Sequence, residues 1–299
     1  MNILALGTIA LDTVKTPSER RENILGGSAV HFAMAARHFM KVTLVSAIGE
    51  DFPREHLDFL KKKGINLDAV ARLGGNSFRW EGEYKKDFNV AITHHTELGV
   101  LPGFKPRLSA HQKNTKTVFL ANLDPDIQAS LLRQLYSPRL VGLDSMNYWI
   151  THKPQPLKRL MKKVDIYFCN DAEAKSLSQE HNLFKASRAL RKLGPKIVII
   201  KKGEHGVLLS CNNSVMVLPA YPVKELIDPT GAGDSFAGGF LGYLANAGRI
   251  SLDNLKKALV LGTVIASFNV ESFGMKRTAR LNKREINQRL KKFKEIIPI

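Results

Sequence analysis

The sequence predicts an α/β protein with a mainly parallel central sheet and helices on both faces. Apolar, β-branched runs recur along the chain without strict alternation, which is typical of strands buried on both faces. Stretches with the apolar spacing of a helix separate these runs, and strands that alternate with helices form parallel sheets. With 44% hydrophobic residues among 299, the chain has enough apolar material for a large core.

The first elements form a strand–helix–strand unit. We expect a strand over residues 2–10, a helix over 28–39 and a strand over 41–48. A second helix is expected over 53–63, because Gly64 follows it and glycine is a common helix stop.

Residues 74–99 interrupt this rhythm. Residues 78–84 alternate in character, residues 93–98 are polar, and several glycines punctuate the segment. These features predict a short antiparallel excursion outside the main sheet. We expect residues 76–99 to pair with residues 13–25 as a lid over a cleft.

The helix–strand rhythm then resumes. Strands are expected near 117–123, 140–146, 165–170 and 196–203, each followed by a helical stretch. No internal repeat, low-complexity segment or linker divides the chain. We therefore expect a single α/β domain over residues 1–299 that carries the small lid.

The chain is strongly basic, with a formal net charge of +18 at pH 7. A basic surface can bind nucleic acid backbones, so a non-catalytic nucleic-acid-binding protein is one alternative to an enzyme. The basic residues are spread along amphipathic stretches, however, with a denser patch only at 283–294, and solvated helix faces explain most such runs. A positive field also attracts anionic phosphates.

Nothing in the sequence predicts export or a membrane partner. No apolar run approaches the roughly 20 residues that span a bilayer, and the first residues lack the basic segment and cleavage site of a leader. The two cysteines, Cys169 and Cys211, fit neither a disulfide framework nor a zinc site. We therefore expect a cytoplasmic protein.

The most informative motif is DPTGAGDSFAGGF at 228–240. Pro229 fixes a bend, and Gly231 and Gly233 allow consecutive backbone N–H groups to turn toward one point at the start of a helix. Such a nest binds an anion through its N–H donors and the positive end of the helix dipole. We expect that dipole to keep Asp234 ionised, so that it can accept a proton from an alcohol. Asp234 can equally cap the helix, and the motif alone leaves both roles open.

This motif, together with Gly26 and Gly27, resembles the two signatures of the pfkB or ribokinase-like family of carbohydrate and nucleoside kinases. The resemblance extends from the first strand to about residue 270. It implies a ribokinase-like fold, ATP and Mg²⁺ as cofactors, and a region that takes a monovalent cation. The complete motif also favours an enzyme over the nucleic-acid-binding alternative.

The resemblance assigns Asp234 as the catalytic base. The anion hole before it is made by the backbone N–H groups of Gly231, Ala232 and Gly233. The family motif NxxE, which organises Mg²⁺ and the phosphates, matches Asn170 and Glu173, with Glu173 acting on the metal through water. A helix N-cap at Asn170 with Glu173 as its partner is the other explanation of this pair.

Further nucleotide contacts are implied at a glycine turn and near the end of the resemblance. Gly203 and Gly206 match the turn that contacts the phosphates, and an ordinary β-turn is the alternative for them. The family often has Thr two positions before the first of these glycines, whereas this chain has Lys201, which can add a positive charge there. Asn269 lies where the family places residues of the adenine and monovalent-cation region.

The acceptor side is implied at the N-terminal end. Asp12 matches the carboxylate that binds acceptor hydroxyls, and Gly26 and Gly27 match the pair that lets a sugar approach the backbone. Many members have Asn four positions later, where this chain has His31, which either bonds a hydroxyl or packs within its helix. Arg79, in the expected lid, is a further candidate for contact with the substrate.

The identity of the acceptor stays open between a sugar and a ribonucleoside. The sequence GGS at 26–28 is similar to nucleoside kinases, whereas His31 fits neither branch, and we favour a sugar-like acceptor. The motifs GxxxxGK[ST], HRD and DFG are absent, which excludes P-loop and protein kinases. A homodimer through the lid is the expected assembly.

Overall fold

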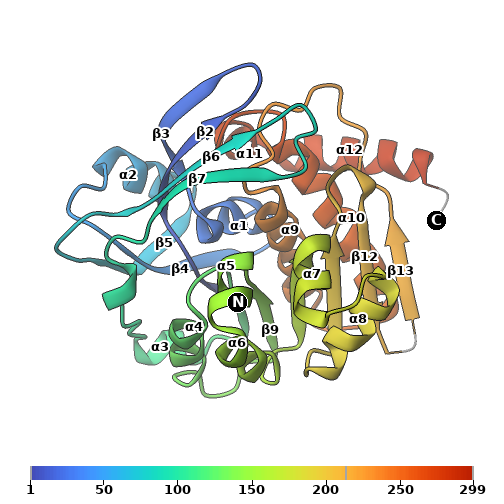
Figure 1. The fold of residues 1–299 in the computed structure, drawn as a ribbon, viewed down its shortest axis with the longest axis horizontal. Coiled ribbons are helices and arrows are strands. Elements are labelled where there is room, and N and C mark those ends of the chain that lie inside the picture. The colour runs from blue at the N-terminus through green and yellow to red at the C-terminus, as the bar shows by residue number, and fades with distance from the viewer. Residues whose placement is uncertain (1, 213, 298–299) are drawn as a thin grey trace.

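The computed structural model describes residues 2–212 and 214–297 and contains two sheets (Figure 1). The strands of the larger sheet are β1 (Asn2–Leu6), β4 (Lys41–Ile48), β5 (Ile65–Arg72), β8 (Thr117–Leu120), β9 (Leu140–Asp144), β10 (Ile166–Asn170), β11 (Ile197–Lys201), β12 (Val207–Cys211) and β13 (Ser214–Leu218). Their order is β13-β12-β11-β10-β9-β8-β1-β4-β5. All pairs from β5 to β11 are parallel, and β12 and β13 add an antiparallel edge that the sequence did not predict.

Helices cover both faces of this sheet. One layer contains α1 (Ser28–Ala36), α2 (Arg54–Lys62), α9 (Ala232–Ala247), α10 (Leu252–Asn269), α11 (Lys276–Arg280) and α12 (Lys283–Ile296). The other contains α4 (Pro125–Leu132), α5 (Asn147–His152), α6 (Pro154–Met161), α7 (Asp171–Ser178) and α8 (Leu183–Lys192). The short α3 (Ala110–Lys113) precedes β8. The predicted α/β class with a mainly parallel sheet is confirmed.

Neighbouring residues of the buried strands face opposite helical layers. In β1, Ile3 and Ala5 pack with the layer of α1 and α9, while Leu4 and Leu6 pack with the layer of α4 and α6. All four side chains are fully buried. Because both faces are covered in this way, the strand is apolar throughout and does not alternate.

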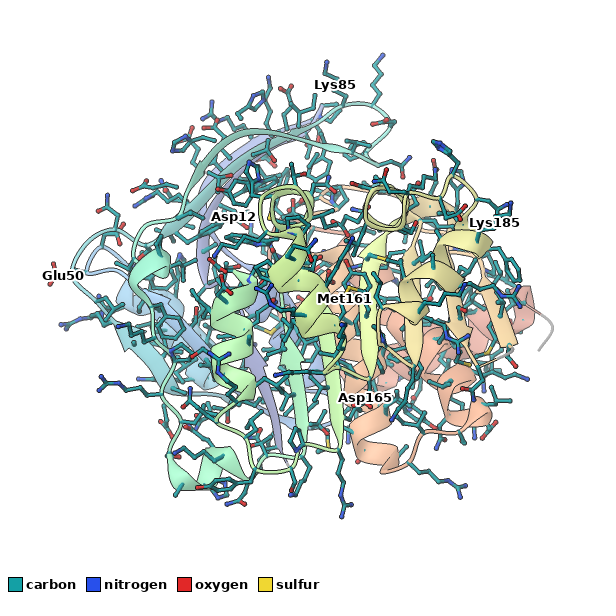
Figure 2. All side chains as sticks on the ribbon, turned by 60° about the horizontal axis from the view of Figure 1, so that its bottom comes forward. Asp12, Glu50, Lys85, Met161, Asp165 and Lys185 are labelled. Atoms are coloured by element: carbon teal, nitrogen blue, oxygen red, sulfur yellow. The ribbon has the colours of Figure 1, made fainter. Side chains whose placement is uncertain are left out.

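The smaller sheet has the order β3-β2-β6-β7. Its strands are β2 (Ala10–Lys15), β3 (Arg20–Gly26), β6 (Phe78–Tyr84) and β7 (Ala91–Glu97). The pairs β2–β3 and β6–β7 are antiparallel, and β2 pairs with β6 in parallel, so the two segments expected to form a lid lie in one sheet. Figure 1 shows these strands crossing above α1 and α9, and Figure 2 shows Lys85 pointing outward at the far tip.

The expected strand over residues 2–10 is wrong at its C-terminal end. The strand stops at Leu6, and Ala10 already belongs to the smaller sheet. At Gly7 the backbone passes so close to α1 that a methyl group would lie 2.8 Å from Oγ of Ser28. Thr8 then bonds to Ser28 through its backbone N–H, which directs the chain out of the large sheet. The helix expected over 28–39 ends at Ala36.

Candidate active site

Three adjacent strands end in polar residues at the same edge of the large sheet. Asp144, Asn170 and Lys201 are the last residues of β9, β10 and β11. Because these strands are parallel, their carboxyl ends lie side by side, with Asn170 in register with Lys201. Nζ of Lys201 lies 2.7 Å from Oδ2 of Asp144. The sheet therefore delivers a buried ion pair to the edge where open α/β sheets bind ligands.

Asn170 and Glu173 form a capping box at the start of α7. Oδ1 of Asn170 accepts a hydrogen bond from the N–H of Glu173 at 2.7 Å, and Oε2 of Glu173 accepts one from the N–H of Asn170 at 2.8 Å. The helix-cap explanation of this pair is thus correct. The hydrogen bond from the N–H of Asn170 also holds the Glu173 carboxylate at the carboxyl edge of the large sheet. Burial, and then the nearby Asp144, raise the pKa of Glu173 to about 7.

The DPTGAGD segment turns sharply into α9. Gly231 has a φ of 73°, in the left-handed region that suits glycine, and α9 begins at the next residue. The Asp228 carboxylate is 1% exposed and accepts hydrogen bonds from the N–H groups of Thr230 and Gly274. These two bonds hold the turn from both sides.

Asp234 lies in the first turn of α9 and its pKa is strongly raised. Burial raises its pKa to about 8, the Asp144 carboxylate adds to the rise, and Lys201 opposes it. Desolvation of the buried carboxylate thus opposes the ionisation that the helix N-terminus favours.

Lys201 also lies beside the expected anion hole. A methyl group built onto Gly233 would lie 3.0 Å from Nζ of Lys201. Burial alone would lower the pKa of Lys201, but Asp144 and then Glu173 raise it above its ordinary value. The ammonium group therefore stays charged next to the turn at 231–234.

Asp12 is buried against the glycine pair of the N-terminal signature. It is 4% exposed, and a methyl group on Gly26 would overlap its Oδ2 atom. Gly27 has a φ of 100° and is the N-cap residue directly before α1. Burial, and then the nearby Asp228, raise the pKa of Asp12 to about 7, against a hydrogen bond from the Gly27 backbone. Only glycine at 26 leaves room for this carboxylate.

His31 joins the acceptor-side helix to the turn before α9. Its Nδ1 lies 3.0 Å from Oδ1 of Asn269, and the Asn269 amide donates to the carbonyl of Thr230 at 2.7 Å. Ser235 donates to the same Oδ1 at 3.0 Å, and the His31 ring fills the space that a side chain at Gly231 would need. Because that oxygen can only accept, Nδ1 of His31 carries the proton.

This bonding pattern fixes the state of the His31 ring. Burial lowers the pKa of His31 to about 4, although the bond to Asn269 opposes the change, so the ring is neutral. Nε2 then carries a lone pair, and it is buried without a hydrogen-bond partner among the described residues. Asn269 itself holds the turn at Thr230, a role that its expected place in the adenine region did not suggest.

The Arg79 side chain contacts residues outside the kinase motifs. Its guanidinium donates to Asp51 at 2.7 Å and to Oδ1 of Asn23 at 2.7 Å. Neighbouring residues of a strand point to opposite faces, and in the β2–β6 register it is Trp80 that pairs with Asp12. The structure therefore does not bring Arg79 together with Asp12, and its guanidinium contacts Asp51 and Asn23 instead.

The comparisons with known proteins agree with this geometry. The family description "pfkB family carbohydrate kinase" matches residues 108–280. The chain belongs to the pfkB family. A cytidine kinase of Thermococcus kodakarensis is 32% identical over 276 residues, which cover 87% of this chain and 96% of that protein. A nucleoside kinase of Methanothermobacter thermautotrophicus is 27% identical over 91% of this chain and 90% of its own length.

Solved structures show the same fold. The nucleoside kinase of Methanocaldococcus jannaschii superimposes with a TM-score of 0.77 at 22% identity, over 97% of this chain and 98% of that one. A ribokinase of Thermotoga maritima gives a TM-score of 0.75 at 22% identity, over 97% and 99%. The ribokinase-like fold is confirmed, and this pfkB kinase is an ATP-dependent phosphotransferase with an alcohol group as acceptor.

Sequence reasoning missed two residues that the structure places at the candidate site. Asp144 ends an apolar strand run at the ligand-binding edge of the sheet, a signal that was available in the sequence. Tyr84, at the end of β6, is 8% exposed, and its hydroxyl oxygen accepts a hydrogen bond from Thr230 at 3.3 Å. An aromatic residue in an alternating strand gives no sequence signal for such a contact.

A second contact joins the smaller sheet to the glycine turn that is expected to bind nucleotide. In the turn between β6 and β7, the Asn89 amide donates to Oε1 of Glu204 at 3.0 Å. Glu204 lies between Gly203 and Gly206, the two glycines expected to contact the phosphates, and both have a positive φ. The smaller sheet thus reaches the motif at 228–234 through Tyr84 and the glycine turn through Asn89.

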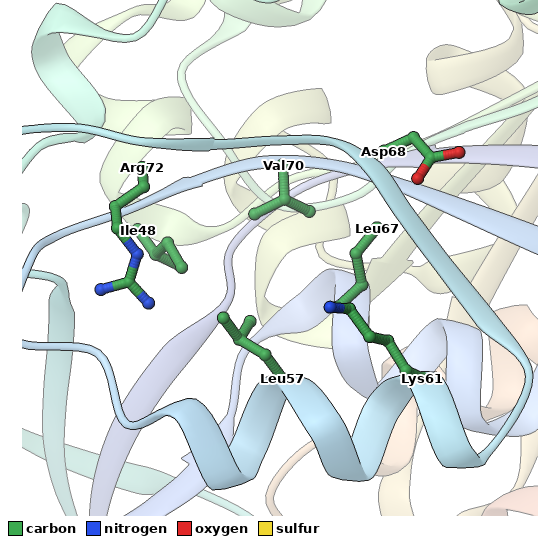
Figure 3. Close-up of a pocket in the computed structure, with 7 residues that line it drawn as sticks. All are labelled: Ile48, Leu57, Lys61, Leu67, Asp68, Val70 and Arg72. Carbon is green, nitrogen blue, oxygen red and sulfur yellow. The ribbon is translucent and has the colours of Figure 1, made fainter.

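A surface cavity lies away from these residues (Figure 3). It has a volume of about 230 Å³ and opens between α2 and β5. Its lining residues are Ile48, Leu57, Lys61, Leu67, Asp68, Val70 and Arg72. None of them belongs to the kinase motifs, so this cavity is not part of the active site.

Proposed function

We propose that this kinase transfers the γ-phosphoryl group of ATP to a hydroxyl group of a ribonucleoside, with Asp234 as the base. The observation that carries the proposal is the position of Asp234, which is close enough to Lys201 on one side and to Asp12 on the other for both to act on its pKa. Lys201 marks the phosphate side and Asp12 the acceptor side. Asp234 is thus the carboxylate between the two halves of the site.

The raised pKa of Asp234 suits a general base. A base is most effective when its pKa lies near the working pH, because it must be both deprotonated and strong enough to take the proton. Burial raises the pKa of Asp234 to about 8, whereas Lys201 favours the carboxylate. In this proposal the acceptor hydroxyl gives its proton to Asp234 while the N–H groups of Gly231, Ala232 and Gly233 hold the charge of the phosphoryl group.

The charges at the sheet edge fit Mg²⁺. The Asp144 carboxylate raises the pKa values of both Glu173 and Asp234, and Lys201 is the cation that opposes both shifts. Bound Mg²⁺ neutralises charge on the transferring phosphates. The described residues contain no group of three or more His, Cys, Asp or Glu that could hold a metal alone. Asn170 and Glu173 are therefore proposed to act on the metal through water and the phosphates.

A monovalent cation is a further proposal, supported by Asp228. This carboxylate is 1% exposed, and burial raises its pKa. Its oxygens accept backbone N–H groups, and no described basic side chain pairs with it. A buried carboxylate without a counter-charge is a chemically suitable cation ligand.

The lid face supports a nucleoside more than a simple sugar. Trp80 is in register with Asp12, and it packs with Tyr84, Val14 and Phe273 in a small apolar cluster. In the proposed pose Asp12 accepts the ribose hydroxyls, the lone pair of His31 accepts another donor of the acceptor, and the aromatic face covers the base. The relatives named cytidine kinase and nucleoside kinase support this choice over the sugar that the sequence favoured.

The smaller sheet is proposed to act as a lid. Closure over the acceptor would exclude water, which competes with it for the phosphoryl group. Assembly as a homodimer through this lid also stays a proposal. No helix in the described chain is long and apolar enough to cross a membrane. The two cysteines are buried and free, which suits the reducing cytoplasm that we propose as the location.

The test is formation of ADP from ATP and Mg²⁺ across ribonucleosides, free sugars and sugar phosphates, with Asp234→Asn as the blank. We expect turnover with a ribonucleoside that is lost in the variant. Turnover with ribose or another sugar alone would replace the nucleoside by the sugar acceptor. Turnover that is equal in the variant would overturn the role of Asp234.

A further inference from the structure

We propose that Lys201 exchanges partners during the reaction, pairing with Asp144 in the free enzyme and with the transferring phosphoryl group once nucleotide is bound. This inference rests on the proposed function, because it requires the phosphates of ATP to lie at the turn 231–234. It adds a role for Asp144, which the family resemblance did not assign: this residue pairs with Lys201 until nucleotide binds.

The starting pair is largely buried and held by neighbouring groups. The distance from Nζ of Lys201 to Oδ2 of Asp144 is 2.7 Å, and the two side chains are 18% and 5% exposed. Oδ1 of Asp144 accepts a hydrogen bond from the N–H of Ser145 at 2.8 Å, so the carboxylate is held on both oxygens. The backbone of both residues is fixed by the strands of the large sheet.

The second partner lies within reach of the lysine without movement of the sheet. A methyl group on Gly233 would lie 3.0 Å from Nζ, so the ammonium group already lies beside the N–H groups that would receive the phosphoryl group. A lysine side chain has several rotatable bonds, and small rotations redirect its three donors. Thr, which the family often has at this position, carries no charge to redirect.

The exchange follows from the charges around the pair. Lys201 in the free protein has Asp144, Glu173 and Asp234 around it, and Asp144 is the carboxylate that raises its pKa most. A phosphoryl group that takes Lys201 leaves Asp144 as a buried carboxylate without its counter-charge, which is unfavourable. The charge of Mg²⁺ would offset this loss, so the exchange predicts that Asp144 opposes nucleotide binding when no Mg²⁺ is present.

The test is the affinity for ATP in the presence of a chelator, measured by titration calorimetry, for the wild type and three variants. Asp144→Asn frees Lys201, and we expect it to bind Mg²⁺-free ATP at least about tenfold more tightly, as for a buried charge contact that is gained. Lys201→Met should bind it more weakly. In the double variant the gain from Asp144→Asn should disappear, because no lysine is left to release.

The double variant separates an exchange from a simple field effect. If Asp144→Asn increases the affinity equally with and without Lys201, only the removal of a negative charge is at work and the proposal is wrong. No gain from Asp144→Asn would overturn it as well. Lys201→Thr serves as a second variant if Lys201→Met does not fold.

A matched control lies at the other end of the same strands. Nζ of Lys196, directly before β11, lies 3.4 Å from Oδ1 of Asp165, directly before β10. Lys196→Met should leave the affinity for ATP unchanged. These titrations need no acceptor, so their outcome is distinct from the assay with Asp234→Asn. A wild type that binds no ATP even with Mg²⁺ would refute the proposed function and this inference together.

Discussion

The carboxyl edge of the large sheet and the smaller sheet build the same site by different means. At the edge, Asp144 and Lys201 are held by neighbouring strands and are largely buried. On the smaller sheet, the ion pair of Lys15 with Glu83 is partly exposed, with side chains 55% and 23% accessible. Buried groups on a fixed frame suit chemistry, whereas a sheet with few deep contacts can open and close. We therefore expect edge residues to control turnover and lid residues to control acceptor binding and the exclusion of water.

The largest expected effect tests the edge. Asp234→Asn should lower kcat by about 10²–10⁴, because it removes the proposed base while the N–H groups of the turn remain. The affinity for ATP should change little, since the amide has the size of the carboxyl group. Steady-state kinetics and titration calorimetry measure the two quantities. Asp253→Asn, on the exposed start of α10, is the control and should behave as the wild type.

Asp12→Asn tests the acceptor side, where the smaller sheet joins the body. We expect the KM for the acceptor to rise about 10- to 100-fold, as for the loss of charged hydrogen bonds of about 1.5–3 kcal/mol. The KM for ATP should stay the same, because Asp12 lies against Gly26 of the N-terminal glycine pair, which is assigned to the acceptor and not to the nucleotide. An unchanged acceptor KM in this variant would remove Asp12 from the acceptor site and leave the lid without a binding role.

Tyr84→Phe tests the link between the lid and the turn before α9. The ring would keep its packing with Val14 and Phe273 but lose the hydrogen bond to Thr230. We expect the ratio of ATP hydrolysis to phosphoryl transfer to rise roughly 2- to 10-fold, the effect of one hydrogen bond of about 0.5–1.5 kcal/mol. ADP formation with and without the acceptor measures this ratio. Tyr148→Phe, on the exposed side of α5, is the control.

An unchanged ratio in Tyr84→Phe would mean that the Thr230 contact does not help the lid to exclude water. The functional difference between the sheet edge and the lid would then be larger. Asn89 would be left as the lid residue that contacts the glycine turn expected to bind nucleotide.

The same difference explains what could be predicted from the sequence. The strand at 41–48 was predicted with its observed bounds, because its apolar run is continuous and ends at clear breaks. Asp234 and the glycines before it could be proposed as site residues because they form one local motif. The strand at 2–10 was predicted too long. The backbone at Gly7 packs closely against Ser28 and Ala121, and these residues are distant in sequence, so no local pattern indicates the end of the strand.

Contacts between distant segments were the least predictable part of the site. The bond of His31 to Asn269 joins residues 238 positions apart, and no local pattern reports it. The raised pKa of Asp234 could not be predicted either, because the helix start is local whereas burial and the carboxylates of Asp144 and Glu173 come from the assembled fold. The contact of Arg79 with Asp51 was unpredictable for a similar reason, since Asp51 lies in another loop.

The smallest expected effect is on stability against pH. Because burial raises the pKa of Asp234 from 3.8 to about 8, the folded protein binds this proton more tightly than the unfolded chain does. The free energy of unfolding therefore falls as the pH rises through this window, and Asp234→Asn removes that fall. We expect the variant to match the wild type near pH 4 and to exceed its Tm by about 2–4 °C at pH 8, as for about 1 kcal/mol.

The comparison of the wild type with the Asp234→Asn variant separates the effect of Asp234 from that of other titrating groups. Burial lowers the pKa of His31 to about 4, which makes stability rise with pH, but His31 is the same in both proteins. Glu83→Gln on the lid is the contrasting variant, because hydrogen bonds from His94 and Lys15 lower the pKa of Glu83 and give no such gain at pH 8. If the difference in Tm between Asp234→Asn and the wild type stays constant across this pH range, the fold does not raise the pKa of Asp234.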